Sequence, residues 1–238
     1  MDATVKRSCV VLLPTYNERD NIEKIVRAIL EAASVDVWIL DDNSPDKTGD
    51  LAEALAQKDK RVRVTHRPNK EGLGKAYLDG FRRALDVGYE RIVQMDADFS
   101  HSPVYLPEML RACDFYDGVL GSRWAPGGGS THWPWYRQML SLGGSWYART
   151  LLNMHVRDVT GGFKCWSRYV LAALDLDAVQ STGYAFQIEM TYRALQAGFA
   201  VRELPIVFVE RTAGISKMNK KIVLEALWRV AQLRRSHP

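Results

Sequence analysis

Val93-Gln94-Met95-Asp96-Ala97-Asp98-Phe99-Ser100-His101 decides the fold, because an apolar run that predicts a buried strand ends there in two aspartates. Ligands of open α/β sheets bind just outside the carboxyl ends of the strands. Two carboxylates at such a place can hold Mg²⁺ or Mn²⁺, which prefer oxygen ligands, together with the phosphates that the metal carries. An isolated Asp-x-Asp is more often a polar turn in which Asp98 or Ser100 caps a helix. The rest of the chain has to decide between these interpretations.

On both sides of this stretch, apolar strands alternate with amphipathic helices. The expected strands cover residues 9–14, 35–40, 62–64, 91–95 and 118–123. This alternation predicts an α/β fold with a doubly wound, Rossmann-like and mostly parallel sheet flanked by helices. We expect a last strand over residues 201–208, at an edge of the sheet because Pro205 cannot donate a ladder hydrogen bond.

The first two strands also end in polar side chains. Thr15-Tyr16-Asn17-Glu18 follows the first strand, and Asp41-Asp42-Asn43-Ser44-Pro45-Asp46 follows the second. An aromatic ring beside polar groups at a strand end suits a nucleotide base, although an ordinary loop can have the same composition.

The chain after the fifth strand departs from the alternation. A glycine run at residues 126–130 predicts a mobile loop that could serve as a lid. Residues 133–152 predict a helix that is apolar over most of its girth and rich in tryptophan. Such a helix is either buried in the core or in contact with lipid, and the sequence favours neither. An amphipathic helix is expected over residues 222–233, and the stretch at 158–166 is polar and rich in glycine.

Composition excludes several classes of protein. The 238 residues are enough for one large α/β domain or two small ones, and a net charge of +4 is low for a nucleic-acid binder. Three scattered cysteines argue against a disulfide framework and favour a reducing compartment. We expect neither a signal peptide nor a membrane span, because no apolar run reaches about 18 residues.

Taken together, these stretches resemble the family 2 glycosyltransferases of GT-A fold, and more narrowly the polyprenol-phosphate (dolichol-phosphate) mannosyltransferases. The resemblance extends from Leu13 to Val230 and depends on six motifs in order rather than on any single one. These motifs are Leu13-Pro14-Thr15-Tyr16-Asn17-Glu18, Asp41-Asp42-Asn43-Ser44-Pro45-Asp46, Met95-Asp96-Ala97-Asp98, Gly121-Ser122-Arg123, Asp158-Val159-Thr160-Gly161-Gly162-Phe163, and Glu210-Arg211 through Ser216-Lys217.

The resemblance implies a site made of three parts. Nucleotide-sugar binding would fall to Pro14, Tyr16, Glu18, Asp42, Asp46 and Asp96. The divalent metal, Mg²⁺ or Mn²⁺, would be held by Asp96, Asp98 and Ser100, with Ser100 standing where some relatives have a glutamine. The acceptor phosphate would be bound by Arg123, Arg137, Ser141, Arg211 and Lys217, and the residues that carry catalysis would be Asp98, Arg123, Arg211 and Lys217.

The implied reaction is an inverting transfer of mannose from GDP-mannose to a polyprenyl (dolichyl-type) phosphate. A phosphate monoester is mostly dianionic at neutral pH, so it can attack the sugar without a general base. One GT-A catalytic domain would span residues 1–238, with the nucleotide-sugar half at 1–121 and the acceptor and membrane-facing half at 122–238. The enzyme would be peripheral on the cytoplasmic face of a membrane, docking directly or through a small membrane subunit.

Two alternatives stay open at this point. UDP-glucose could replace GDP-mannose as the donor, because base selection depends on a few hydrogen bonds. A non-catalytic, membrane-associated subunit that binds nucleotide sugar is the less favoured alternative, because such a protein would be expected to lose the Asp96/Asp98 pair or the arginines.

Overall fold

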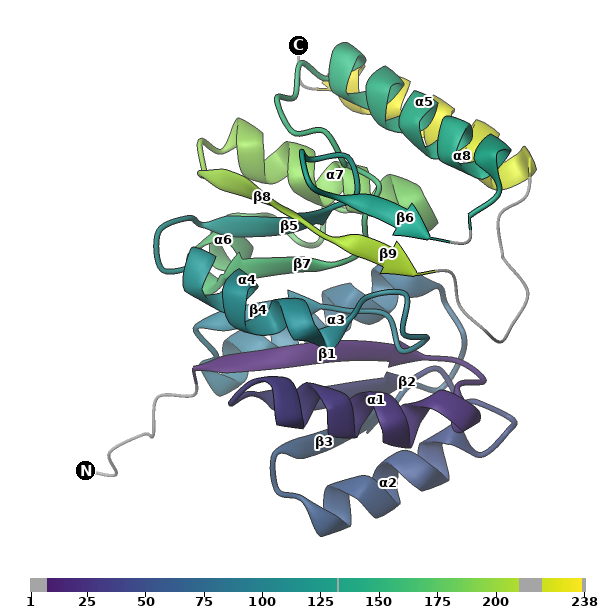
Figure 1. The fold of residues 1–238 in the computed structure, drawn as a ribbon, viewed down its shortest axis with the longest axis vertical. Coiled ribbons are helices and arrows are strands. Elements are labelled where there is room, and N and C mark those ends of the chain that lie inside the picture. The colour runs from purple at the N-terminus through teal and green to yellow at the C-terminus, as the bar shows by residue number, and fades with distance from the viewer. Residues whose placement is uncertain (1–7, 132, 210–219, 237–238) are drawn as a thin grey trace.

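A seven-stranded sheet organises the molecule (Figure 1). The computed structural model describes residues 8–131, 133–209 and 220–236. The strand order is β3 (Val62–His66), β2 (Asp36–Asp41), β1 (Cys9–Thr15), β4 (Arg91–Gln94), β7 (Lys164–Ser167), β5 (Gly118–Ser122) and β8 (Val201–Pro205). All neighbours in this order are parallel except the two pairs that involve β7. The predicted mostly parallel α/β sheet is confirmed.

The central strands are apolar without interruption because helices cover both faces of the sheet. In β1, Val10 and Leu12 belong to the core on one face, while Val11 and Leu13 belong to the core on the other. None of the four is exposed to solvent. A run with no polar alternation is what a parallel strand buried on both faces requires.

Helices form a layer on each face. Helices α1 (Arg19–Ala32), α2 (Thr48–Lys58) and α4 (Leu106–Ala112), preceded by the short turn η1 (Pro103–Tyr105), lie in front of the sheet in Figure 1. Helices α3 (Leu73–Val87), α6 (Arg168–Ala173) and α7 (Gly183–Gln196) pack together on the opposite face. Between these layers β1, β2 and β4 run parallel, so their carboxyl ends lie at the same edge of the sheet, and the site lies at that edge.

Strand β7 departs from the sequence analysis, which expected only a polar, glycine-rich stretch there. It runs antiparallel between β4 and β5, so that Cys165 pairs with Val93 on one side and Val119 on the other. Trp166 is fully buried and donates from Nε1 to Gln94 Oε1 at 2.7 Å. Four residues are too few to show the periodicity of a strand, and their partners lie far away in the sequence.

Two further expectations need correction. The glycine run is not only a loop, because Gly129–Thr131 forms β6, which pairs in parallel with β9 (Val207–Val209). The strand expected over residues 201–208 is in fact two strands, β8 and β9. Pro205 is the last residue to pair with β5, and the chain then leaves the main sheet. The predicted edge position of this segment is confirmed for β8.

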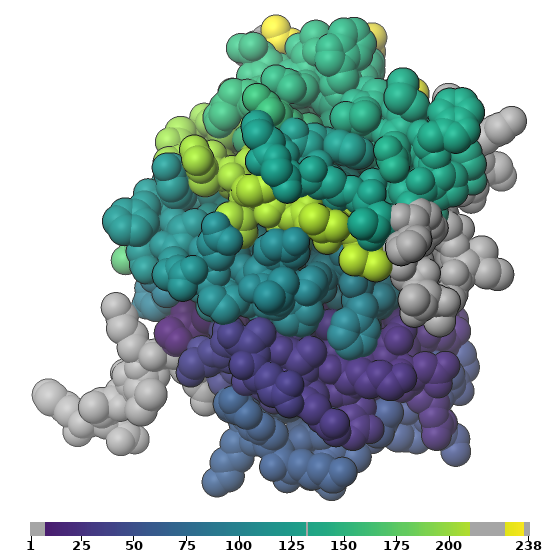
Figure 2. Space-filling model, viewed as in Figure 1, coloured from purple at the N-terminus to yellow at the C-terminus, as the bar shows by residue number. Residues whose placement is uncertain are grey.

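Helices α5 (Trp135–Leu151) and α8 (Lys220–Ser236) pack against each other at the top of the molecule in Figure 1. Only Ser145 and Ala148 of α5 are buried, so α5 is a surface helix and not the core helix that the sequence also allowed. Trp135 and Trp146 are 77% and 67% exposed. Figure 2 shows α5 forming the upper end of the surface. Among the described residues, no helix has the length and apolar character needed to cross a membrane.

Candidate active site

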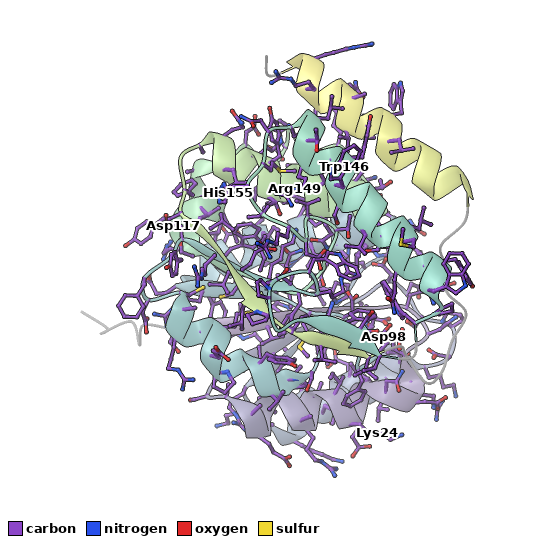
Figure 3. All side chains as sticks on the ribbon, turned by 45° about the horizontal axis from the view of Figure 1, so that its top comes forward. Lys24, Asp98, Asp117, Trp146, Arg149 and His155 are labelled. Atoms are coloured by element: carbon purple, nitrogen blue, oxygen red, sulfur yellow. The ribbon has the colours of Figure 1, made fainter. Side chains whose placement is uncertain are left out.

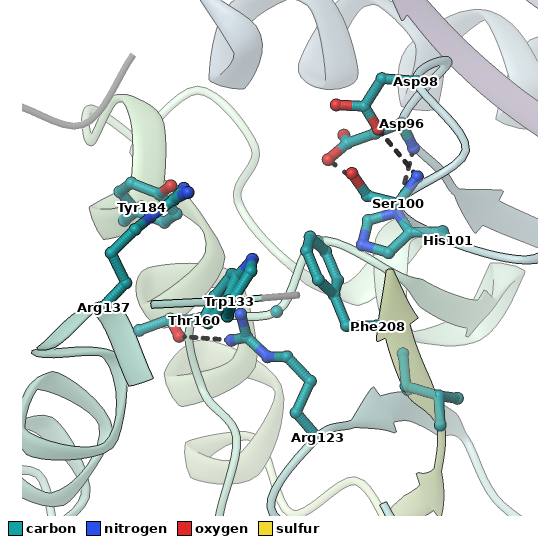
Figure 4. A pocket seen from close by; sticks show the side chains of 14 residues that line it. Asp96, Asp98, Ser100, His101, Arg123, Trp133, Arg137, Thr160, Tyr184 and Phe208 are labelled. Carbon is teal, nitrogen blue, oxygen red and sulfur yellow. Dashed lines mark hydrogen bonds and ion pairs between the residues drawn. The ribbon is translucent and has the colours of Figure 1, made fainter. Parts of the chain in front are cut away.

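A cleft opens at the carboxyl ends of the central strands, where polar side chains from distant segments converge (Figure 4). An acidic turn of Asp96, Asp98 and Ser100 follows β4 and forms one side of it. Arg123, directly after β5, and Arg137, on α5, lie across the cleft, with Phe208 between the acidic and basic groups in the view of Figure 4. The cleft can thus hold a cation at the acidic turn and an anion beside the two arginines.

The acidic turn is held by its own backbone. The backbone N–H of Ser100 donates to Asp98 Oδ1 at 3.0 Å, and the N–H of Asp96 donates to His101 Nδ1 at 3.2 Å. Because Nδ1 accepts this bond, the neutral imidazole of His101 carries its proton on Nε2. Phe99 takes a left-handed φ of 63°, which is unfavourable for an aromatic residue. Backbone strain of this kind gathers at functional sites.

Two buried residues support the acidic turn from below. His101 is 2% exposed and stacks on Phe163 with ring centroids 5.2 Å apart. Tyr77 of α3 is fully buried, and its pKa lies well above the ordinary value because of burial first and the charge of Asp96 second. The phenol therefore stays neutral beside the carboxylate and adds no further negative charge to the turn.

The ligands available in this turn fit a magnesium or manganese ion. Asp96 and Asp98 supply two carboxylates, and the Ser100 hydroxyl lines the same cleft. The parts of the chain that the structure describes contain no cluster of three or more His, Cys, Asp or Glu side chains around a potential metal position. Mg²⁺ is typically held by one or two carboxylates together with substrate phosphates and water, and not by a cage of protein ligands. The turn matches that pattern.

Arg123 is fixed in place by a buried ion pair. Its Nε and Nη2 donate to the two carboxylate oxygens of Asp158, each at 2.7 Å, and Nη2 also donates to Thr160 Oγ1 at 2.9 Å. Burial opposes the charge of both partners, but their mutual attraction outweighs it, so the pKa of Arg123 is raised and that of Asp158 is lowered. Arg123 is therefore a rigid cation rather than a mobile one.

Aromatic rings enclose the two arginines. The guanidinium carbon of Arg123 lies 5.2 Å from the ring centroid of Trp133 and 5.5 Å from that of Phe208. Arg137 also lies 5.2 Å from the Trp133 centroid. Cation–π contacts of this length stabilise a cation without using its hydrogen-bond donors. Both arginines line the cleft together with Trp133 and Phe208.

A second, apolar cavity continues from the same arginines. It has a volume of about 270 Å³, and Leu140, Tyr147, Ile188, Leu227 and Val230 are among its apolar lining residues. The residues shared by the two cavities are Arg123, Trp133, Arg137, Thr160 and Tyr184. We call this cavity the apolar groove. It runs between α5, α7 and α8, and Ser141 and Gly144 also line it.

The residues predicted to bind the nucleotide lie at the carboxyl ends of β1 and β2. Asp42 forms a buried ion pair with Arg67, and its pKa is nevertheless raised because burial outweighs the attraction. The Asp46 carboxylate accepts from the backbone N–H groups of Thr48 and Arg19 at 3.0 and 3.2 Å. These two carboxylates therefore already have partners within the protein.

Glu18 and Tyr16 at the same edge also have partners. Glu18 Oε2 accepts from Asn21 Nδ2 at 3.0 Å. The Lys70 ammonium lies 3.6 Å from the ring centroid of Tyr16. Pro14 precedes them near the end of β1 and pairs with Leu40. Of the six residues predicted to bind the nucleotide sugar, only Asp96 lines the cleft itself.

The structure brings most of the predicted metal and acceptor residues together. Asp96, Asp98, Ser100, Arg123 and Arg137 line the cleft, and Ser141 lines the apolar groove. Arg211 and Lys217 lie outside the described residues.

Several residues of the site were not assigned roles from the sequence. Asp158 and Thr160 fall in a recognised motif, but only the fold shows that they hold Arg123. Trp133 and Tyr184 line both cavities, yet an aromatic residue in a loop or at a helix start gives no signal of its own. Of these residues, His101 could most easily have been identified from the sequence, because it directly follows the acidic turn.

Comparison with known proteins places the chain in a family. The model for glycosyl transferase family 2 matches residues 10–174. A polyprenol monophosphomannose synthase of Mycolicibacterium smegmatis is 46% identical over 235 residues, covering 97% of this chain and 89% of that protein. An undecaprenyl-phosphate mannosyltransferase of Micrococcus luteus is 44% identical over 224 residues, covering 94% of this chain and 92% of that protein.

Solved structures confirm the fold. A glucosyl-3-phosphoglycerate synthase of Mycobacterium tuberculosis, in complex with Mn²⁺, UDP and glucosyl-3-phosphoglycerate, superposes with a TM-score of 0.69. The match covers 99% of this chain and 82% of the other, at 18% sequence identity. A likeness at that identity concerns the arrangement of helices and strands, which is of GT-A type.

Proposed function

Because this chain belongs to glycosyl transferase family 2, we propose that it transfers mannose from GDP-mannose to a polyprenyl phosphate, with inversion at the sugar. The relatives from M. smegmatis and M. luteus, named for polyprenol phosphate and undecaprenyl phosphate, support this acceptor class. In this proposal residues 1–121 bind the nucleotide sugar, and residues 122–238 bind the acceptor within the same catalytic domain.

One observation carries the proposal: the cleft and the apolar groove share Arg123 and Arg137. An acceptor that fits both must have an anionic head for the arginines and an apolar tail for the groove. Arg123 uses Nε and Nη2 for Asp158 and Thr160, so it offers its charge and its Nη1 donors, and Arg137 adds a second guanidinium to the same cleft. Arginine favours phosphate oxygens as partners, which favours a phosphate as the head. A polyprenyl phosphate has this combination of groups.

The proposed reaction is a single displacement. A phosphate oxygen of the acceptor forms a bond to the anomeric carbon while the bond from that carbon to the diphosphate breaks, and GDP leaves with the electron pair. No general base is needed, because the acceptor is mostly dianionic at neutral pH. Arg123 and Arg137 reduce the repulsion between the two anions, with Arg211 and Lys217 proposed as further cations. Ser141 is proposed to donate a hydrogen bond to the acceptor.

A divalent cation would be held by Asp96 and Asp98, with Ser100 as a direct or water-mediated third ligand. When bound, such an ion neutralises charge on the leaving diphosphate. The structural relative that binds Mn²⁺ together with UDP supports this choice of ion. The protein's own part is to orient the Asp98 carboxylate through the Ser100 N–H and to hold the backbone of Asp96 through His101.

We further propose that the protein docks to the cytoplasmic face of a membrane, either directly or with the help of a small membrane subunit. The exposed apolar side of α5 supports contact with a membrane surface. Trp135, Met139 and Trp146 are 77%, 61% and 67% exposed, and Figure 3 shows Trp146 on this helix. Trp228 on the neighbouring helix α8 is 60% exposed. Tryptophan favours the interface between headgroups and acyl chains, and the apolar groove lies between the same helices.

The decisive experiment supplies the protein with radiolabelled GDP-mannose, vesicles that contain undecaprenyl phosphate, and Mg²⁺ or Mn²⁺. We expect labelled lipid from the wild-type chain. Arg137→Ala should lower kcat/KM for the lipid at least about tenfold while GDP affinity is unchanged. Arg149→Ala, on the same helix but outside both cavities, should retain activity. Folded wild-type protein that makes no labelled lipid with either metal would exclude the proposal.

The groove can be tested separately. A Cβ at Gly144 would have no neighbour within 4 Å, so Gly144→Leu can fold and would fill the groove. We expect this variant to use undecaprenyl phosphate poorly and a short, water-soluble prenyl phosphate normally. Thr150→Leu adds comparable apolar bulk on an exposed position of the same helix and should behave as wild type. Equal loss with both acceptors would contradict a chain-binding role for the groove.

UDP-glucose as the donor is the second candidate. A thermal-shift comparison of GDP with UDP distinguishes the two donors. The non-catalytic alternative has less support, because Asp96, Asp98, Arg123 and Arg137 are all retained and share one cleft.

A further inference from the structure

Gln187 stands out among the buried polar side chains near the cleft. It lies on α7 and is 2% exposed, yet neither Oε1 nor Nε2 has a hydrogen-bond partner among the described residues. Buried amides are nearly always paired, because leaving their donors and acceptors unsatisfied is costly. Lys164, whose side chain reaches the same helix, is paired: its Nζ donates to the Gln187 backbone oxygen at 2.6 Å and to Thr191 Oγ1 at 2.9 Å.

The Gln187 amide lies directly behind a glycine of the cleft wall. A Cβ on Gly162 would be 3.6 Å from Gln187 Nε2, 3.7 Å from Asp96 Oδ2 and 3.4 Å from His101 Cε1. Gly162 itself lines the cleft. Because Gly162 has no side chain, an atom placed at this position would be in contact with both the Gln187 amide and the Asp96 carboxylate.

We propose that Gln187 is a specificity-determining residue that binds a hydroxyl group of the transferred hexose through the space at Gly162. This inference depends on the proposed function, because it assumes that a nucleotide sugar occupies the cleft. A hydroxyl can donate to Asp96 Oδ2 and accept from Gln187 Nε2 at the same time. A hydroxyl has one proton, so this arrangement requires Nε2 of Gln187 to face the space, and Nε2 is the amide atom nearest to it in the structure.

The chemistry of the pair selects a neutral hydroxyl over a phosphate oxygen. A phosphate oxygen placed between Gln187 and Asp96 would be repelled by the carboxylate, whereas a hydroxyl is attracted to it. A site built to pair with a particular hydroxyl discriminates strongly against a sugar that lacks it, because the buried polar groups are then left unpaired. The position of this one amide would thus help to decide which hexose is transferred.

The test compares binding of GDP-mannose and GDP to the full chain by calorimetry in the presence of Mn²⁺. Gln187→Met keeps the shape of the side chain and removes its hydrogen bonds. We expect the Kd for GDP-mannose to rise about tenfold and the Kd for GDP to stay within about twofold. Among the four GDP-deoxymannoses lacking the 2-, 3-, 4- or 6-hydroxyl, one should bind the wild type about tenfold more weakly and lose nothing further in the variant.

Gly162→Ala provides an independent variant that should fold. Its Cβ would make only ordinary contacts, at 3.4 Å or more, and it would occupy the place of the hydroxyl. We expect the same selective loss for GDP-mannose. Gly129→Ala, where a Cβ would have no neighbour within 4 Å, is the matched control and should bind both ligands normally.

The outcomes separate this inference from the proposed function. Wild-type transfer to the lipid, together with equal weakening of GDP and GDP-mannose in Gln187→Met, would overturn the role of Gln187 alone. Additive losses for all four deoxy analogues would do the same. If the wild type binds UDP-glucose instead, the UDP and UDP-glucose pair replaces the GDP pair in the same measurement. A wild type that binds neither nucleotide sugar would overturn both.

Discussion

Two strands of the sheet end in closely spaced aspartates, but the protein treats the two ends differently. At the end of β2, Asp41 accepts from Thr15 Oγ1 at 2.9 Å and from Ser44 Oγ at 2.6 Å, and Asp42 pairs with Arg67. At the end of β4, the Asp96 side chain is 36% exposed, whereas that of Asp42 is 8% exposed. Asp96 and Asp98 line the cleft.

This difference shows that aspartates at the end of an apolar strand can have either of two roles. Where serine, threonine and arginine are within reach, the carboxylates become part of the fold. At the β4 end, the Asp98 carboxylate accepts from the backbone N–H of Ser100, and both Asp96 and Asp98 line the cleft, where they can meet a ligand. Variants at the two ends should therefore separate stability from activity.

The largest effect is expected from breaking the buried pair at the β2 end. Arg67→Ala leaves Asp42 buried without its cation and should lower the free energy of unfolding by about 3–5 kcal/mol. Urea denaturation measures this loss. Arg61→Ala removes an exposed pair with Asp59 and should cost less than about 1 kcal/mol. If Arg67→Ala and Arg61→Ala lowered the free energy of unfolding equally, the aspartates at the β2 end would not have this stabilising role.

Asp98→Asn should show the reverse pattern at the β4 end. We expect kcat for lipid mannosylation to fall at least about 100-fold, which is about 2.7 kcal/mol, because the metal and diphosphate lose a carboxylate. The free energy of unfolding, measured in urea, should stay within about 1 kcal/mol of the wild-type value. Asp50→Asn, exposed in the first turn of α2, is the control and should change neither quantity. Normal turnover by Asp98→Asn would refute its role.

The polar network beneath the β4 end should respond to pH. Burial lowers the pKa of Lys164 to about 7 from its ordinary value of 10.5, against the opposing effect of Asp158. Between these values the unfolded chain binds more protons than the folded chain, so the free energy of unfolding should rise with pH, by up to about 1.4 kcal/mol per unit. Lys164→Met should remove this slope. Denaturation curves of wild type and Lys164→Met at pH 7, 8 and 9 give the free energy of unfolding at each pH. If it changed with pH equally in both proteins, Lys164 would not be the source of the slope.

The smallest effect is expected from one hydroxyl group at the β2 end, which donates to Asp41 and accepts from the backbone N–H of Asn17. Ser44→Ala removes the hydroxyl that donates to Asp41 and should cost about 1 kcal/mol. The melting temperature should fall by a few degrees while kcat and KM for GDP-mannose remain at wild-type values. A selective loss of donor affinity would instead show that this loop contributes directly to nucleotide binding.

Much of the fold was predictable because the strands of the parallel sheet are long apolar runs. β1, β2 and β4 were expected at nearly their observed positions, and α7 and α8 followed from helical periodicity or amphipathic pattern. β7 could not be predicted, because its four residues owe their strand conformation to partners on β4 and β5. The splitting of the last expected strand at Pro205 depends in the same way on where β5 ends.

The candidate site was predictable in its residue types but less so in its pairings. The motifs brought Asp96, Asp98, Arg123 and Arg137 into consideration together, and the cleft contains all four. The bond between Arg123 and Asp158 spans 35 residues and follows from the position of β7, which the sequence did not reveal. Whether an aspartate is already paired within the protein is decided by neighbours in space, and no local pattern reports them.

The central position of β7 has a consequence for the order in which the chain becomes structured during synthesis. Residues 91–122 provide β4 and β5, but the gap between these strands is filled only by residues 164–167. An emerging chain can build β1 to β4 and must then leave the inner edge of β4 without a partner for some seventy residues. Unpaired strand edges favour association with other chains. We therefore expect release from the ribosome before residue 167 to yield an aggregating fragment, and the boundary near residue 121 to separate two functions but not two folding units.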